Sequence, residues 1–138
     1  MIGAAAQDAF ISSQRWAVVT TLRRDGSPAS SVVFFARMGD ELLFSTTMDR
    51  FKAKSVQRDP RINLVVLDEG APFRFVSIEG TATLDHDNLV ANHEFINRAM
   101  RNDPSWSAPD GMLEKLQHDR RVIVRIRAER VSGVVDRS

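Results

Sequence analysis

The chain has 138 residues, 43% hydrophobic and 27% charged, which are the proportions of one ordinary globular domain spanning residues 1–138. The formal net charge is +1, so no overall field attracts nucleic acid or an anionic membrane, and any anion site must be local. The lack of cysteine excludes disulfides, thiolate metal sites and cysteine catalysis. Neither a signal peptide nor an apolar run of roughly 20 residues is found, so we expect a cytoplasmic protein that does not enter a membrane.

Most of the predicted elements are strands joined by tight turns. Helices are expected over residues 4–14, 50–57, 85–102 and 112–118. Strands are expected over residues 16–23, 29–38, 41–47, 61–68, 73–84 and 121–128, with a short extension over 131–135. Asp-Gly and Gly-Asp pairs mark the turns after the first two strands, and Gly80 in mid-strand predicts a bulge. Six strands connected in this way close best as a small antiparallel barrel, so the expected fold class is mainly β with short flanking helices.

The strand over residues 29–38 is apolar on both of its faces. Alternation places Val32 and Phe34 on one face and Val33 and Phe35 on the other. In a protein built from antiparallel hairpins, one of these faces should be exposed to solvent. The second face is therefore expected to meet a helix, a flat ligand or another copy of the chain, and we favour the ligand together with the second copy.

A segment rich in hydroxyl groups and cations follows the strand over residues 41–47. The hydroxyl residues are Ser45, Thr46 and Thr47, and the cations are Arg50, Lys52 and Lys54. Asp49 is the expected N-cap of the short helix that carries these cations. Cations normally favour the other end of a helix, because the N-terminal end already carries partial positive charge. The pattern predicts an anion-binding socket, with phosphate as the preferred anion. The same residues could also form a helix start whose charges are simply exposed to solvent.

Several kinds of catalytic machinery are missing from the sequence. His86 and His93 lie in the expected helix over residues 85–102, and His118 lies in the one over residues 112–118. Their spacing is not that of metal ligands, so they are expected on helix surfaces and no metal site is predicted. Neither a hydrolase elbow nor a glycine-rich nucleotide motif occurs. Any turnover would therefore depend on a cofactor that carries its own reactivity, and no catalytic residue is assigned.

Two further features allow two interpretations each. Arg121, Arg125 and Arg127 share one strand face, where they could steer an anionic ligand or keep an edge strand from pairing with other chains. Trp106 lies in a proline-bounded loop, where its ring could form a lid over a flat ligand or anchor the loop.

The order of several short segments is typical of a known family. These segments are Thr20–Pro28, Leu43–Thr47, Arg50–Lys52, Arg58–Arg61, Phe73–Val76, Glu79–Gly80 and Arg121–Ile126. The most specific portion is Arg50-x-Lys52 followed seven residues later by Asp59-Pro60-Arg61. Over residues 17–135 the chain resembles the pyridoxamine 5'-phosphate oxidase-like split β-barrel family, and more narrowly its small branch of flavin- or deazaflavin-dependent oxidoreductases.

The resemblance implies a six-stranded antiparallel split β-barrel that forms a homodimer with the cofactor between the subunits. By this resemblance Arg50 and Lys52 hold the cofactor phosphate, with hydrogen bonds from Ser45, Thr46 and Thr47. The ring system is lined by Val32, Val33 and Phe34, and the partner subunit contributes Arg74 and Phe75. Lys54 is added from its spacing alone.

The resemblance also sets the expected reaction. Hydride is expected to pass from reduced coenzyme F-420 to a small organic acceptor. The alternatives are an FMN-dependent oxidoreductase, a non-catalytic carrier of flavin, deazaflavin or haem, and a dimeric module without a ligand. The arginine- and histidine-bearing C-terminal segment of enzymes that oxidise pyridoxamine phosphate is missing, which argues against that reaction. Asp49 also departs from the pattern, because it places a negative charge beside the expected phosphate.

Overall fold

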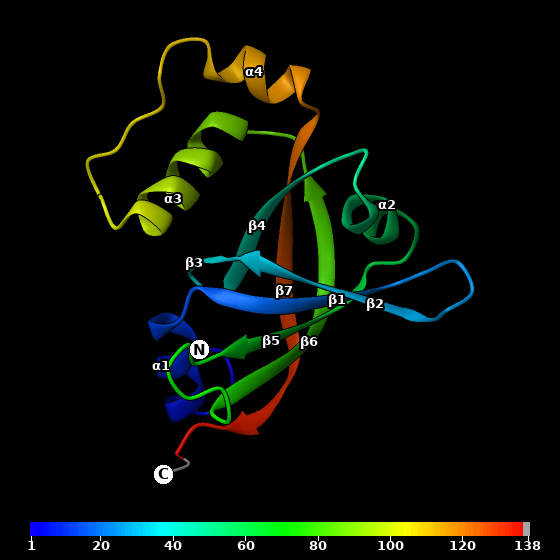
Figure 1. Ribbon diagram of the computed structural model, residues 1–138, viewed down its shortest axis with the longest axis vertical. Coiled ribbons are helices and arrows are strands. Elements are labelled where there is room, and N and C mark those ends of the chain that lie inside the picture. Colours follow the sequence, from blue (N-terminus) through cyan, green and yellow to red (C-terminus); the bar gives the residue numbers. More distant parts are fainter. Residues whose placement is uncertain (137–138) are drawn as a thin grey trace.

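The computed structural model of the protein describes residues 1–136 and consists of one strongly curved antiparallel sheet with short helices around it (Figure 1). The elements in chain order are α1 (Ala5–Ser13), β1 (Trp16–Leu22), β2 (Pro28–Phe34), β3 (Ala36–Met38), β4 (Glu41–Thr47), α2 (Phe51–Arg58), β5 (Arg61–Leu67), β6 (Phe75–Asp85), α3 (Leu89–Arg101), α4 (Met112–His118) and β7 (Arg121–Val134). The predicted mainly β class is confirmed, but the sheet has seven strands instead of six.

The extra strand arises because the segment expected as one strand over residues 29–38 is divided at Phe35. The Phe35 N–H donates to the Arg15 carbonyl oxygen at 2.9 Å, in register with the ladder between β1 and β2, and Phe35 itself belongs to neither β2 nor β3. Beyond this break the chain pairs with β4 instead of β1. The sheet order is β2-β1-β5-β6-β7-β4-β3, so two consecutive strands lie at opposite ends of one sheet and the barrel is split between them.

The concave side of the sheet holds the main hydrophobic core. Phe44, Leu64, Ile78, Val124 and Ile126 are fully buried there, and they alternate with outward residues along their strands, as strand geometry requires. The predicted bulge is confirmed by a register shift between Glu79 and Gly80. A Cβ atom at Gly80 would collide with the backbone of β7, so the close approach of the two strands requires glycine.

Part of the convex side is covered by α3. Ile96 on this helix packs with Ala36, Leu43 and Ile123 in a second, smaller core. Figure 1 shows α3 and α4 together beyond one end of the sheet, joined by a long loop. The helix thus covers part of the second apolar face that the sequence indicated, whereas Val32 on the same face remains 67% exposed.

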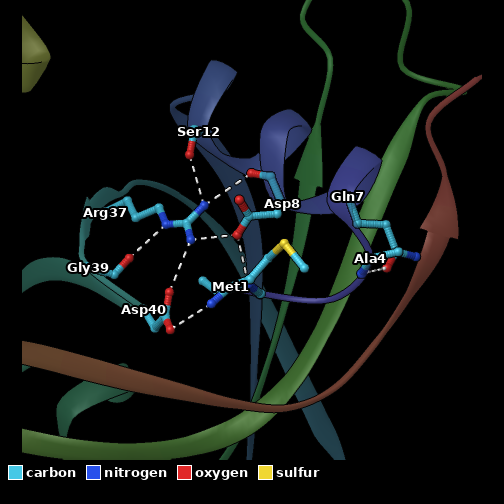
Figure 2. A network of polar contacts seen from close by, with 9 residues as sticks. Met1, Ala4, Gln7, Asp8, Ser12, Arg37, Gly39 and Asp40 are labelled. Carbon is cyan, nitrogen blue, oxygen red and sulfur yellow. Dashed lines mark hydrogen bonds and ion pairs between the residues drawn. The ribbon is translucent and has the colours of Figure 1, made fainter.

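A polar network holds α1 against the turn between β3 and β4 (Figure 2). Its centre is Arg37, which contacts an Asp8 carboxylate oxygen at 2.6 Å, the Ser12 hydroxyl at 2.8 Å and the Gly39 carbonyl at 2.8 Å. The Met1 amino group reaches Asp40 at 2.8 Å. Hydrogen bonds from the Ile2 N–H and from Arg37 hold the pKa of Asp8 below its usual value. None of the helices within residues 1–136 is long and apolar enough to span a bilayer.

Candidate anion-binding site

The turn between β4 and α2 arranges the predicted anion socket. The Arg50 N–H closes this turn on the Thr47 carbonyl at 2.9 Å, and α2 begins at Phe51 with Arg50 in extended conformation as its N-cap. The prediction that Asp49 caps the helix is therefore wrong, because the turn places Asp49 one residue too early. A hydrogen bond from the Thr47 side chain lowers the pKa of Asp49, and no side chain caps α2. The first N–H groups of the helix are left without a side-chain acceptor.

A pocket of about 340 Å³ opens beside this turn, between β2, β4 and α3. It is lined by residues that the sequence selected, namely Val32, Val33, Phe34, Ser45, Thr46, Thr47, Arg50 and Lys52. It is also lined by Ile96, Met100 and Arg121. The two groups of predicted residues, one apolar and one polar, therefore form walls of the same pocket.

Within the part of the chain that the structure describes, none of the three cations of the pocket, Arg50, Lys52 and Arg121, forms a salt bridge. Several arginines elsewhere are paired with carboxylates, as in the 2.7 Å contact between Arg125 and Asp85. Burial of the Lys52 ammonium, together with repulsion from Arg50, lowers the pKa of Lys52. Cations held close together without a salt-bridged carboxylate, two of them (Lys52 and Arg121) partly buried, favour an anion ligand over a solvated helix start.

A histidine that the sequence analysis placed on a helix surface lies behind the pocket wall. His93 on α3 is only 5% exposed, and its Nε2 lies 2.7 Å from the Ser45 Oγ. Its Nδ1 lies 2.7 Å from the Leu89 carbonyl oxygen, one helical turn earlier. The expectation of a surface position is therefore wrong for His93. The spacing of Leu89, His93 and Ile96 at i, i+4 and i+7 is the signal that marks this face of α3 as buried.

Lys54 lies outside the pocket. It lines a separate groove of about 830 Å³ on the other side of the start of α2, together with Arg23, Arg24 and Arg58. Asp25 is the carboxylate in the lining of this groove, and an exposed Phe51 ring forms part of its floor. Lys52 thus lines the pocket, whereas Phe51 and Lys54 on the same helical turn line the groove.

Phe75 is the first residue of β6 and Arg74 precedes it, and neither lines the pocket of its own chain. Arg74 contacts Asp68 at 2.8 Å and donates to the Val135 carbonyl oxygen at 2.8 Å. Phe75 is paired with Leu67 on β5. Their assignment to the pocket of a partner subunit stays a prediction.

The interpretation of the β7 arginines as protection for an edge strand is wrong, because β7 lies between β6 and β4 inside the sheet. Arg121 reaches the pocket, whereas Arg125 is held by Asp85 and by the Asn92 side chain at 3.0 Å. Trp106 anchors its loop to α3. The Arg101 guanidinium lies 4.9 Å from its ring centroid, and its carbonyl accepts from Arg98 Nε at 2.6 Å.

Within residues 1–136 no three His, Asp or Glu side chains are placed to hold a metal ion together. The pocket combines cations, hydroxyl groups and one apolar wall. It is suited to an anionic group that is attached to an apolar body.

Solved structures share this fold. An F420 reductase is 22% identical over 94% of this chain and 98% of its own, with a TM-score of 0.73. A FAD-binding protein from Mesorhizobium loti is 18% identical over 96% of this chain and 94% of its own, with a TM-score of 0.68. A heme-binding protein from Mycobacterium smegmatis is 18% identical over 99% of this chain and 57% of its own, with a TM-score of 0.67.

At such identities these likenesses establish the fold alone, and a search of curated proteins gave no match. The family described as "Pyridoxamine 5'-phosphate oxidase" matches residues 4–135, which is nearly the whole chain. That match agrees with the split, mainly β sheet and with the order of segments that carried the resemblance. The chain belongs to the pyridoxamine 5'-phosphate oxidase family.

Proposed function

We propose that the pocket binds the phosphate of a deazaflavin or flavin coenzyme and that the protein is an oxidoreductase. The preferred reaction passes hydride from reduced coenzyme F-420 to a small organic acceptor. The observation that carries the proposal is the group of Arg50, Lys52 and Arg121 around one pocket without a carboxylate partner among the described residues. Each cation would form charge-assisted hydrogen bonds to a phosphate oxygen, and the Thr47 hydroxyl lines the same pocket.

The apolar wall of the pocket supports a planar ring as the body of the ligand. Val32, Val33 and Phe34 form this wall, and the Phe34 ring packs edge-on against Trp16 with centroids 5.6 Å apart. When bound, the coenzyme supplies the hydride chemistry, and the chain supplies orientation and exclusion of water. A ring against Val32 would cover part of the apolar surface that α3 leaves open.

A second copy of the chain is the proposed cover for the rest of this surface. The strand register places Val32 opposite Val18, and Val18 opposite Val65, in one row across β2, β1 and β5. Trp16 continues the apolar surface and is 40% exposed. A homodimer that joins these faces would enclose the ring and bring Arg74 and Phe75 of the partner subunit toward it.

The groove on the other side of α2 favours F-420 over FMN. FMN ends at its phosphate, whereas the phosphate of F-420 is a diester that continues into a tail of glutamate residues. Arg23, Arg24, Lys54 and Arg58 line the groove opposite a single carboxylate, Asp25. A chain of carboxylates that leaves the pocket past the start of α2 would find these cations next.

Cofactor transport without turnover is the second candidate function. The observation that favours it is that, within residues 1–136, neither a carboxylate nor an imidazole lines the pocket, because His93 is buried behind Ser45. The heme-binding relative shows that the fold accommodates ligands other than flavins. A carrier would bind coenzyme tightly and transfer no hydride to any acceptor.

Titration of the purified protein with F-420 and FMN, each oxidised and reduced, tests the proposal. Binding is followed by coenzyme fluorescence, and turnover by the absorbance of reduced coenzyme in the presence of quinone and enone acceptors. The proposed reaction requires F-420 binding together with acceptor-dependent oxidation. Tight binding without oxidation supports the carrier, and a protein that binds neither coenzyme refutes both the oxidoreductase and a carrier of either coenzyme.

A further inference from the structure

The hydrogen bonds of His93 determine which way the Ser45 hydroxyl points. Nδ1 of His93 faces the Leu89 carbonyl oxygen, which can only accept, so Nδ1 carries a proton. In the neutral ring Nε2 is then a bare lone pair, and the Ser45 hydroxyl must donate to it across 2.7 Å. The hydroxyl proton of Ser45 is therefore directed away from the pocket that Ser45 lines.

In this state Ser45 has no hydrogen-bond donor directed toward an anion in the pocket. Its Oγ accepts a long contact of 3.5 Å from Arg121 Nη1, and only lone pairs remain for the pocket. A phosphate oxygen placed beside Ser45 would meet another acceptor. The hydrogen bond from Ser45 to a phosphate, which the family resemblance implies, therefore requires the hydroxyl to give up its bond to Nε2 while His93 is neutral.

Protonation of His93 reverses the chain of hydrogen bonds. Nε2 then donates to the Ser45 Oγ, and the Ser45 hydroxyl is free to donate into the pocket. We propose that His93 and Ser45 form a proton-linked switch of the anion pocket. When an anion binds, the protein takes up one proton at His93 Nε2. The inference rests on the proposed function only in requiring that the pocket takes a phosphate-like anion.

The groups around His93 set the sign of this coupling. On its own helix the Leu89 carbonyl faces Nδ1, from β4 the neutral Ser45 faces Nε2, and from β7 the Arg121 guanidinium lies next to Ser45. Arg50 and Lys52 approach from the turn before α2, on the pocket side.

The nearby carboxylates form ion pairs with other arginines. Glu94 on α3 pairs with Arg98 at 3.7 Å, and Asp85 at the end of β6 pairs with Arg125 at 2.7 Å. The charge that acts on His93 in the free protein is therefore positive.

Burial lowers the pKa of His93 in the free protein, the Leu89 carbonyl opposes this, and the charge of Arg121 lowers the pKa further. A bound anion counters Arg121 and accepts from Ser45, so it raises the pKa of His93. Between the two pKa values the anion binds with uptake of a proton, and its affinity falls up to about tenfold for each unit of rising pH.

Sulfate is the probe, because it keeps a single charge state while histidine titrates, between about pH 5 and 8. The three histidine signals of the whole protein are followed by NMR with and without saturating sulfate, and the His93→Gln variant identifies its signal. His86 and His118 are exposed and serve as internal references. We expect sulfate to move the titration midpoint of His93 upward and to leave the two reference midpoints unchanged.

Sulfate affinity measured by calorimetry across the same pH range provides the second readout. The native protein should bind sulfate more tightly as pH falls, and His93→Gln should flatten this dependence. Ser45→Ala should weaken binding more at low pH than at high pH, because only the imidazolium form releases the hydroxyl. This variant keeps the switch testable if His93→Gln does not fold.

A His93 midpoint that saturating sulfate leaves unchanged overturns the switch, as does a sulfate affinity in the native protein that is independent of pH or undetectable. Proton-linked sulfate binding in a protein that binds neither F-420 nor FMN refutes the proposed coenzyme and leaves the switch standing.

Discussion

Removal of Arg50 and Lys52, the two pocket cations at the start of α2, is the most direct test of the anion pocket. Arg50→Ala and Lys52→Ala each remove one charged donor from a pocket that a third cation, Arg121, also lines. A hydrogen bond to a charged group contributes about 1.5–3 kcal/mol, so the double variant should lose about 3–6 kcal/mol of coenzyme binding. That loss corresponds to a Kd raised by roughly a hundredfold to ten-thousandfold.

The same substitutions should leave the free protein as stable as before or make it more stable. Repulsion from Arg50 contributes to the lowered pKa of Lys52, so removal of either charge relieves an unfavourable interaction. The two gains in folding stability are therefore expected to be less than additive, since either change alone relieves the repulsion between Arg50 and Lys52. A gain in folding stability with a loss of binding is typical of residues that are kept for function.

The assay is a fluorescence titration of F-420 and of FMN against the native protein, both single variants and the double variant. Thermal unfolding without ligand is recorded on the same samples. Lys115→Ala is the matched control, because Lys115 is an exposed cation on α4 outside the pocket. A loss below tenfold for the double variant, or a loss equal to that of Lys115→Ala, would refute the reasoning.

Four further changes test separate features of the molecule. Val32→Asp places a charge on the exposed apolar face and should dissociate the proposed homodimer, as measured by sedimentation; an unchanged mass would count against that interface. Lys54→Ala should weaken the binding of F-420 with a long glutamate tail several-fold and leave FMN unaffected, so an equal loss for both coenzymes would remove the groove from the account. Gly80→Ala should lower the free energy of unfolding by more than about 1 kcal/mol in urea, because the new Cβ meets the backbone of β7. Hydrogen bonds from Arg61 lower the pKa of Asp59 to about 2, so its stabilising effect is complete above the unfolded pKa of about 3.9 and is lost as pH falls toward 2. Asp59→Asn should therefore reduce stability at neutral pH and show a smaller further loss than the native protein over that acid range.

Local patterns in the sequence were sufficient for most of the elements. Period-two alternation and Asp-Gly turns located the strands, and the bulge at Gly80 follows from a glycine in mid-strand. The division of the second strand at Phe35 was missed, because the change of partner strand from β1 to β4 after this residue leaves no trace in the pattern of apolar residues. The start of α2 was misplaced by one residue because a turn also accepts Asp49.

The residues of the candidate site likewise fall into those that local sequence patterns predict and those that only the packing of distant segments brings together. The hydroxyl groups and cations from Ser45 to Lys52 are close in sequence, and a strand that runs into a helix start brings them together by local geometry alone. His93 and Arg121 stand 48 and 76 residues from Ser45 and reach it only when α3 packs on the convex side of the sheet and β7 pairs with β4.

The sequence by itself thus determined the mainly β class, the turns and the cluster of cations, because these depend on neighbours within a few residues. Only the tertiary structure decided that Lys54 faces a different groove from Lys52 and that His93 is buried behind Ser45. The direction of a side chain on a short helix and the burial of a histidine depend on which distant surface packs against them, and hydrophobic packing makes that choice for the whole chain at once.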